Sequence, residues 1–321
     1  MLASASNPME ARGTGKYEKL LARCAQLRPL ETAVVHPCDN VSLGAAIEAA
    51  RAGIITPILV GPAHRIRRVA KDLGVDIASY QVEDVPNSHA AAARAVEVVR
   101  TGRASVLMKG SLHTDELMAE VVRRDTGLRT DRRVSHVFVM DVPTYHKPLL
   151  VTDAAVNIAP TLDDKRDIVQ NAVDFARALG ITPPKVAILS AVETVTTKIP
   201  STIDAAALCK MADRGQIHDA VLDGPLAFDN AISAEAAATK GIASPVAGDP
   251  DILLVPDLEA GNMLAKNLAF LSRADAAGVV LGARVPIVLT SRADNQRTRM
   301  ASCAVAAIFA EMRRQSTAVA A

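Results

Sequence analysis

The stretch SVLMKGSLHTDELMAEVVRRDT, residues 105–126, shows the pattern that decides the fold. It opens with a short apolar run, SVLM, continues through a polar loop, KGSLHTDE, and then fits a helix from Asp115 to Thr126. A strand made only of apolar residues is buried on both faces, as in parallel sheets that helices cover on either side. The stretch therefore predicts a buried strand that is connected to a helix by a polar loop.

The same pattern recurs along the rest of the chain. Other apolar runs of strand length begin at Ala33, Pro57, His136, Leu149, Val186, Ala220, Ile252, Gly278 and Pro286. Helical spacing is found over 41–53, 88–101, 161–180 and 297–314, and the segment from Thr161 has acids in its first turn and Gly180 at its end. The predicted fold class is therefore α/β with mainly parallel sheets.

The length of the chain favours more than one lobe. At 321 residues it exceeds the size at which a single hydrophobic core usually stops growing, so we expect two α/β domains with a cleft between them. The composition, 50% hydrophobic and 22% charged residues, is that of an ordinary globular protein and predicts a fully folded chain. No linker or internal repeat marks the boundary between the two domains.

Charge and composition argue against several classes of partner. A net charge of +1 removes the strong electrostatic case for nucleic acid, and 2% aromatic residues without Trp leave little for stacking on bases. We expect no membrane partner, because the apolar segments are too short or too interrupted to span a bilayer. Four scattered cysteines and an N-terminus without the apolar stretch of a signal peptide favour the cytoplasm.

Several well-known motifs are missing from the sequence. No G-x-G-x-x-G follows a strand, no phosphate-binding G-x-x-x-x-G-K-[ST] occurs, and no G-x-S-x-G elbow is present. The seven histidines form no H-x-H or H-x-x-x-H pair suited to zinc, so no metal site is predicted. Nucleotide hydrolysis and serine-hydrolase chemistry therefore have no support in the sequence.

Polar residues accumulate where the predicted strands end. The loops in question are KGS from Lys109, TDAAVN from Thr152, PDLEAGN from Pro256 and TSRADNQR from Thr290. In open parallel sheets ligands bind beyond the carboxyl ends of the strands, where helix N-termini offer free N–H groups. Any one of these loops could instead carry Asp or Ser only to cap a helix. Several together favour a functional site.

Two long stretches resemble a known family. They are DGPLAFDNAISAEAAATKGIASPVAGDPDILLVPDLEAGNMLAKNLAFL from Asp223 and AAGVVLGARVPIVLTSRAD from Ala276, and they are similar to the phosphate acetyltransferase and phosphate butyryltransferase family. The resemblance continues upstream through MKGSLHTDELM from Met108 and LLVTDAAVNIAP from Leu149. It covers roughly residues 20–315.

This resemblance implies an architecture and an activity. The expected fold has two α/β/α domains, similar to isocitrate and isopropylmalate dehydrogenases, with residues 1–138 plus 291–321 in the first and 139–290 in the second. The expected reaction is acyl-CoA + phosphate = acyl phosphate + CoA, with acetyl as the main acyl group and butyryl as the alternative. A homodimer is expected, and no cofactor beyond the substrates coenzyme A and phosphate.

The resemblance also implies a catalytic set, Ser291, Arg292 and Asp294. Arg292 suits the phosphate because its fixed fork of donors can hold two oxygens at once, and Ser291 is expected to donate to the developing oxyanion. The base is an open question, because the acetyl branch resembles a pattern with an aspartate where Thr298 stands here. Asp294 is the nearest carboxylate, and a helix cap is its other possible role.

The remaining candidates are expected to bind substrate. They are Lys109, Gly110, Ser111, Thr114, Arg133, Asp153, Asn157, Glu259, Gly261 and Asn262. Lys109 could instead be a solvated lysine at a strand end, and Asp153 with Asn157 could merely order a turn. The arginine cluster from Arg123 to Arg133 could attract the phosphates of coenzyme A or form a charged solvent face. Gly261 allows close backbone approach, which could serve the domain interface instead.

Two functions of other classes compete with acyl transfer. One is a decarboxylating oxidoreductase on the related fold, which would need a nicotinamide site and clustered aspartates for a metal. The other is a non-catalytic regulatory or scaffolding lobe, in which the SRAD segment would be inert. An activity assay with and without NADP plus magnesium separates the three.

Overall fold

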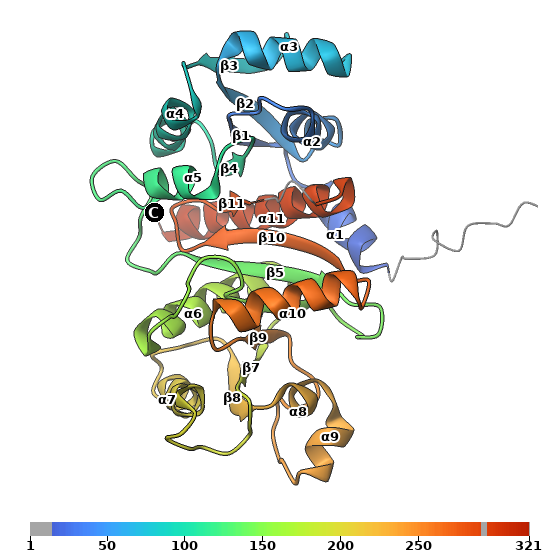
Figure 1. The fold of residues 1–321 in the computed structure, drawn as a ribbon, viewed down its shortest axis with the longest axis vertical. Helices are drawn as coiled ribbons and strands as arrows, with labels where there is room; N and C mark the ends of the chain where they lie inside the picture. Colours follow the sequence, from blue (N-terminus) through green and yellow to red (C-terminus); the bar gives the residue numbers. More distant parts are fainter. Residues whose placement is uncertain (1–14, 290–293, 321) are drawn as a thin grey trace, which may run out of the picture.

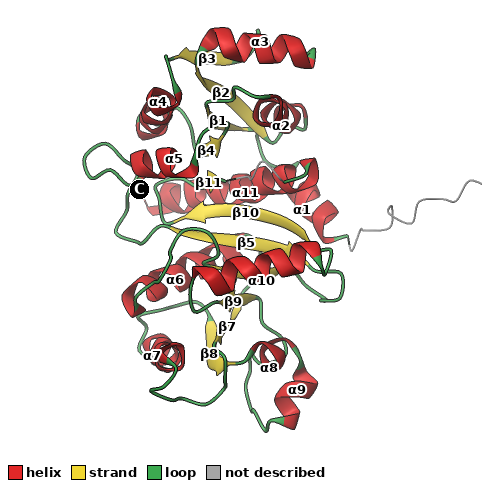
Figure 2. Cartoon of the chain, in the orientation of Figure 1, coloured by secondary structure: helices red, strands yellow, loops and turns green. Residues whose placement is uncertain are grey.

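The computed structural model describes residues 15–289 and 294–320, and these form a layered α/β fold. Eleven strands of this part of the chain lie in one sheet, in the order β3-β2-β1-β4-β11-β10-β5-β6-β9-β7-β8. Figure 1 shows this sheet running the length of the molecule, with β5, β10 and α11 across its middle. Helices cover both faces of the sheet, as Figure 2 shows by colour.

The strands have the following bounds. They are β1 (Leu30–Val35), β2 (Ile55–Gly61), β3 (Gln81–Asp84), β4 (Val106–Lys109), β5 (Ser135–Asp141), β6 (Leu149–Thr152), β7 (Lys185–Leu189), β8 (Val221–Leu226), β9 (Ile252–Leu254), β10 (Asp275–Leu281) and β11 (Ile287–Val288). Each predicted apolar run overlaps one of them, which confirms the α/β class. The strand that the sequence pattern missed is β3, because it lies at the sheet edge and its residues are only half-buried or exposed.

The helices mostly alternate with the strands, except that β5 and β6, β10 and β11, and α8 and α9 follow one another directly. They are α1 (Lys16–Cys24), α2 (Asn40–Arg51), α3 (Ala63–Leu73), α4 (Ser88–Arg100), α5 (Thr114–Val121), α6 (Leu162–Ala178), α7 (Pro200–Asp213), α8 (Phe228–Ile232), α9 (Ala234–Thr239), α10 (Leu258–Phe270) and α11 (Gln296–Ala320). Thr161 and Asp164 form a capping box at the start of α6, and Gly180 follows its end with φ +87°, a left-handed conformation that glycine adopts without strain.

The sheet is mostly parallel, as predicted, with an antiparallel centre. The block β3-β2-β1-β4-β11 is parallel, and so is the block β6-β9-β7-β8. Between them β10 pairs antiparallel with both β11 and β5, and β5 pairs antiparallel with β6. From β1 the chain first adds β2 and β3 on one side of β1, and then returns to place β4 on its other side. The strand order therefore reverses between β1 and β4.

Three apolar clusters fill the space between sheet and helices. One contains residues of α2, α6 and α11 on one face of the sheet, including Phe175 and Phe309, whose ring centroids are 5.6 Å apart. The second lies between the sheet and α4 and α5, and the third packs beneath α8 and α10. These clusters fix the strand ends, and with them the polar loops that follow.

Candidate functional site

The reversal point between β1 and β4 brings the KGS loop against the end of β1. The Gly110 amide donates to the carbonyl oxygen of Val35 at 2.9 Å, and the Ser111 amide donates to that of His36 at 2.9 Å. A Cβ atom added at Gly110 would lie 2.3 Å from the Val35 oxygen, so only glycine allows this approach. In folds of this kind, ligands bind beyond the carboxyl ends of the strands at the point where the strand order reverses. The KGS loop lies at such a point.

His36 is a candidate that the sequence pattern did not single out. The Ser111 hydroxyl donates to the carbonyl oxygen of His36 at 2.8 Å, and the His36 Nδ1 lies 3.1 Å from the carbonyl oxygen of Ser111. Since a carbonyl only accepts, Nδ1 carries the proton. The residue is 5% exposed, and its Nε2 has no hydrogen-bond partner among the described residues. Burial lowers the pKa of His36, which keeps this nitrogen an acceptor.

Lys109 and Thr114 flank this turn. Lys109 is half-buried at the end of β4, and its Nζ approaches the Gly110 carbonyl oxygen at 3.4 Å. Thr114 is exposed at the first position of α5, where backbone amides have no partner in the helix. Both are therefore placed beside the predicted anion-binding turn.

Asp153, directly after β6, is the most heavily bonded of the predicted site residues. Its carboxylate is buried and accepts from the backbone amides of Ala155 and Val156 through Oδ1, each at 2.9 Å. Oδ2 accepts from the His136 amide at 3.1 Å and from the Asn157 side chain at 2.6 Å. The carboxylate thus orders the TDAAVN turn, which was the alternative role considered for it.

Asn157 connects this turn to Arg133 through hydrogen bonds. Its Oδ1 accepts from Nε of Arg133 at 2.8 Å, while its own Nδ2 also donates to the Val134 carbonyl oxygen at 2.9 Å. The Arg133 side chain is 55% exposed, and its Nε also lies 3.6 Å from Oδ1 of Asp164. Its Nη1 and Nη2 make no hydrogen bond within the described part of the chain. A guanidinium held at Nε with two open terminal nitrogens can bind an anion.

The PDLEAGN segment packs against the same turn. Asp257 caps α10 by accepting from the Ala260 amide at 2.9 Å, and Asn262 donates to the Ala154 carbonyl oxygen at 3.2 Å. A Cβ atom added at Gly261 would lie 2.7 Å from the Asp153 carbonyl oxygen. Gly261 and Asn262 therefore hold α10 against the turn, whereas Glu259 is exposed in the first turn of α10.

The segment that the sequence predicts to be catalytic is only partly described by the structure. Ser291 and Arg292 lie outside the described residues, whereas Asp294 is half-buried just before α11. Asn295 supplies a cap hydrogen bond to α11, because its Oδ1 accepts from the Thr298 amide at 2.8 Å. Thr298, which stands at the position of the aspartate in the acetyl pattern, is half-buried in the first turn.

Three of the polar loops adjoin one apolar cluster. Leu112, which follows Ser111, belongs to the cluster between the sheet and α4 and α5. Val156, between Asp153 and Asn157, packs against the same cluster, and so does Leu289, which precedes the TSRAD segment. The KGS and TDAAVN loops and the end of the chain segment before residue 290 therefore contact the same hydrophobic cluster.

The described residues contain no group of three or more His, Cys, Asp or Glu side chains that could hold a metal ion. Their four cysteines are free thiols, and burial raises the pKa of Cys303 to about 12. No helix within these residues combines the length and apolar character needed to cross a membrane.

Known proteins similar to this chain share its size and fold. A family model described as phosphate acetyl/butaryl transferase matches residues 88–307. A phosphate acetyltransferase of Rhizobium meliloti is 67% identical over 93% of this chain and 95% of its own length. A phosphate butyryltransferase of Clostridium acetobutylicum is 42% identical over 92% of this chain and 98% of its own length.

A crystal structure agrees with these sequence matches. A branched-chain phosphotransacylase from Enterococcus faecalis V583 superposes with a TM-score of 0.77 at 31% identity, covering 88% of this chain and 99% of that one. The likeness extends over the mixed sheet and its helices. The chain belongs to the phosphate acetyl/butyryl transferase family.

Proposed function

We propose that this protein transfers an acetyl group between coenzyme A and inorganic phosphate, acetyl-CoA + phosphate = acetyl phosphate + CoA. The observation that carries the proposal is the 67% identity over 93% of the chain to a phosphate acetyltransferase, against 42% to a butyryltransferase. Butyryl transfer is the second candidate, because the SRAD segment is closer in form to the butyryl-type branch than to the acetyl pattern.

The proposed chemistry uses the segment after β11. Toward acetyl-CoA, the thiolate of coenzyme A attacks the carbonyl carbon of acetyl phosphate, and a C–S bond forms. Ser291 donates to the oxyanion, and Arg292 holds the phosphate, which leaves with the electron pair of the broken C–O bond. Asp294 accepts the thiol proton; a free thiol has a pKa near 8.5, so a base greatly increases the thiolate fraction.

The other predicted residues are proposed to bind the two substrates. Arg133 offers its open Nη1 and Nη2 to the phosphates of coenzyme A, and Asn157 holds it in place. Lys109, Gly110, Ser111 and Thr114 are proposed to form an anion-binding turn, in which Lys109 and the first amides of α5 supply the charge and the donors, because the Gly110 and Ser111 amides already donate to backbone carbonyls. His36 supports this turn through Ser111 and does not contact the anion, since its Nε2 is buried and only accepts hydrogen bonds. Glu259 is assigned to the rim of the same site, because it is exposed on the helix that packs against the Asp153 turn.

The proposal also covers the domain division, the cellular location and the oligomeric state of the protein. We assign residues 1–138 plus 291–321 and residues 139–290 to two domains of the isocitrate/isopropylmalate dehydrogenase type, with substrates bound in the cleft between them. The protein is proposed to be cytoplasmic and homodimeric and to use no cofactor. Met263, Phe270 and Leu271, which are 64, 78 and 77% exposed on and just after α10, support a second copy covering this helix.

The test is thiol release from acetyl-CoA and butyryl-CoA in phosphate buffer, with a phosphate-free control. We expect phosphate-dependent release that is faster with acetyl-CoA. Faster release from butyryl-CoA would move the assignment to the second candidate, and no release from either would overturn both. Magnesium-dependent oxidation of a hydroxy acid, with reduction of NADP and loss of carbon dioxide, would instead identify the decarboxylating oxidoreductase.

A further inference from the structure

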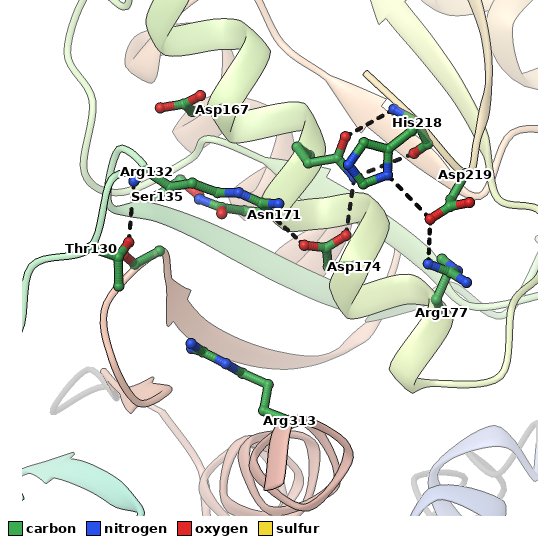
Figure 3. Close-up of polar contacts among 12 residues, drawn as sticks. Thr130, Arg132, Ser135, Asp167, Asn171, Asp174, Arg177, His218, Asp219 and Arg313 are labelled. Atoms are coloured by element: carbon green, nitrogen blue, oxygen red, sulfur yellow. Dashed lines mark hydrogen bonds and ion pairs between the residues drawn. The ribbon is translucent and has the colours of Figure 1, made fainter. Parts of the chain in front are cut away.

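A cavity of about 670 Å³ lies between α6, α11 and the turn that precedes β5, and none of the predicted site residues that the structure describes lines it. Three arginines from these three elements line it, namely Arg132, Arg177 and Arg313. In Figure 3 the Arg313 side chain extends from α11 toward the side of α6 that carries Asn171 and Asp174. The volume lies in the range of sites for small organic ligands.

Two of the arginines keep most of their donors open. Arg132 contacts Asp174 at 2.5 Å and Arg177 contacts Asp219 at 2.6 Å, and each does so through Nη1. Among the described residues, neither makes another hydrogen bond through its guanidinium. Because a guanidinium has five N–H donors, each can still hold an anion with Nε and Nη2.

Arg313 places a third positive charge in a drier part of the cavity. Its Nη1 donates to the Ala283 carbonyl oxygen at 2.8 Å, and its guanidinium lies 5.9 Å from the ring centroid of Phe309. Burial lowers the pKa of Arg313, the like charge of Arg132 lowers it further, and Asp174 opposes both. An anion bound beside Arg313 would relieve this cost of burying a charge.

The rest of the lining fits a ligand with an organic part. Phe309, Met312 and Ala178 supply apolar surface, and Thr130 and Thr182 supply hydroxyl groups. The carboxylates of Asp131 and Asp174 also line the cavity, so the three arginines leave it with one net positive charge. A bare phosphate ion would fill only a small part of about 670 Å³. The chemistry therefore fits a phosphate-bearing organic anion, with its phosphate among the arginines and its apolar part against Phe309.

The cavity wall is bonded to the residues that position the Asp153 turn. Asn171, in the wall, donates to the carbonyl oxygen of Arg133 at 2.8 Å, and Thr130 donates to that of Gly282 at 2.6 Å. Arg132 faces the cavity, while its neighbour Arg133 bonds Asn157. A ligand that shifts the 130–133 segment would therefore change how Arg133 meets a substrate.

We propose that Arg132, Arg177 and Arg313 form a second anion site, separate from the reacting centre, which binds a phosphate-bearing small molecule and alters substrate affinity. Binding at this site does not require acyl transfer. An experiment can therefore contradict the anion site without contradicting the proposed reaction, and the reverse.

The experiment titrates the full chain with inorganic pyrophosphate by calorimetry, alone and with saturating coenzyme A. We expect binding that persists in the presence of coenzyme A with a changed dissociation constant, and that is at least tenfold weaker in Arg177→Gln and in Arg313→Lys. Arg67→Gln, an exposed arginine on α3, is the matched control and should bind as the parent does. Without pyrophosphate, the variants should keep kcat and the KM for phosphate within about twofold.

Three results would overturn the inference. The first is no binding, and the second is binding that neither variant weakens, which would make pyrophosphate an adventitious ion elsewhere on the surface. The third is competition, in which coenzyme A displaces pyrophosphate and both variants raise the KM for coenzyme A. That result would make the cavity part of the substrate site. Arg313→Lys keeps the charge, and a thermal melt of each variant checks that it is folded.

Discussion

At the residue scale, the carboxylate of Asp153 explains how the TDAAVN turn holds its shape. It accepts hydrogen bonds from the amides of His136, Ala155, Val156 and Asn157 and from the Asn157 side chain. These donors converge on one buried group, and among residues 15–289 and 294–320 no Lys or Arg forms an ion pair with it. The sequence left open whether Asp153 lines a cleft or orders a turn. The structure shows that it orders the turn, and that the same hydrogen bonds orient Arg133 through Asn157.

Asp153→Asn tests this arrangement. The substituted amide would turn a donor toward backbone donors, so we expect the free energy of unfolding to fall by about 2–4 kcal/mol. The measurement is urea unfolding, and Asp163→Asn is the control because that side chain is 82% exposed on α6. Equal stability of the two variants would contradict the role assigned to Asp153.

Arg292→Ala tests the proposed phosphate contact. The substitution removes a bidentate donor that is proposed to act on the leaving phosphate, so kcat should fall by about 100-fold or more. Unfolding in urea should match the parent protein, which separates a catalytic loss from a structural one. Arg67→Ala, on the exposed side of α3, serves as the control. Near-normal turnover of Arg292→Ala would remove Arg292 from the site.

His136 predicts how stability depends on pH. Complete burial lowers its pKa from 6.5 to about 4, although Asp153 opposes the shift. Between these values the unfolded chain binds a proton that the folded chain does not, so stability present above pH 6.5 is lost as the pH falls toward 4. The loss is of the order of 3 kcal/mol over that window.

The measurement compares thermal midpoints at pH 7 and pH 5 for the parent and for His136→Gln. The variant keeps the backbone amide that donates to Asp153 and removes the titrating ring. We expect a smaller drop in the midpoint for the variant, and parallel drops would show that His136 does not titrate in this way.

At the scale of elements, Gly261 sets how closely α10 approaches the Asp153 turn. Gly261→Ala would place a methyl group 2.7 Å from both the Asp153 carbonyl oxygen and a methyl carbon of Val255. We expect a loss of about 1–3 kcal/mol in stability and a higher KM for coenzyme A, since the turn must move. Urea unfolding and steady-state kinetics measure the two effects.

Gly44 offers a matched control within the same chain. It lies in α2, and a Cβ atom added there would meet nothing within 4 Å. Gly44→Ala should therefore stabilise the protein by roughly 0.5–1 kcal/mol, because alanine loses less backbone entropy in a helix. A similar loss at both positions would mean that contact with the turn is not what makes Gly261 necessary.

The strands and helices differ in how far the sequence determined them. Apolar runs in the sequence predict buried strands such as β7 and β9. The edge strand β3 contains no such run. The pattern also extended α5 to Thr126, but the helix ends at Val121 and the chain turns at Gly127, where any Cβ atom would meet the Val121 and Arg123 oxygens. Local periodicity does not reveal such close approaches.

In the candidate site, too, local sequence patterns predicted some features and missed others. The loops after β4 and β6 and the TSRAD segment were singled out because polar residues follow apolar runs, and the catalytic roles within TSRAD were predicted from the family resemblance. His36 was missed because a single histidine after a strand gives no pattern, and its role depends on Ser111, which is 75 residues away in the chain. The antiparallel pairing of β5 and β10 was likewise not predicted, since it joins segments that are distant in sequence.

At the scale of the whole molecule, the exposed apolar side chains on α10 predict the oligomeric state. Met263 and Phe270 are seven positions apart and so lie on one helix face, with Leu271 next to them. We expect the parent protein to have twice the 33.7 kDa chain mass by light scattering, and Phe270→Glu to shift it toward the single chain.

Val41→Glu is the control for that substitution. Val41 is 41% exposed on α2, which Figure 1 places in the half of the molecule away from α10. The control should leave the mass unchanged. A parent protein that elutes as a single chain, or a Phe270→Glu variant that stays dimeric, would remove α10 from the proposed interface.

The position of β11 has a consequence for biosynthesis. This two-residue strand lies between β4 and β10. Its Ile287 pairs with Leu107, which is synthesised 180 residues earlier. At about 5–20 residues per second, the nascent chain keeps the edge of β4 open for roughly 10–40 s before its neighbour is made. An unpaired strand edge recruits other strands, so newly made chains should depend on chaperones during this interval.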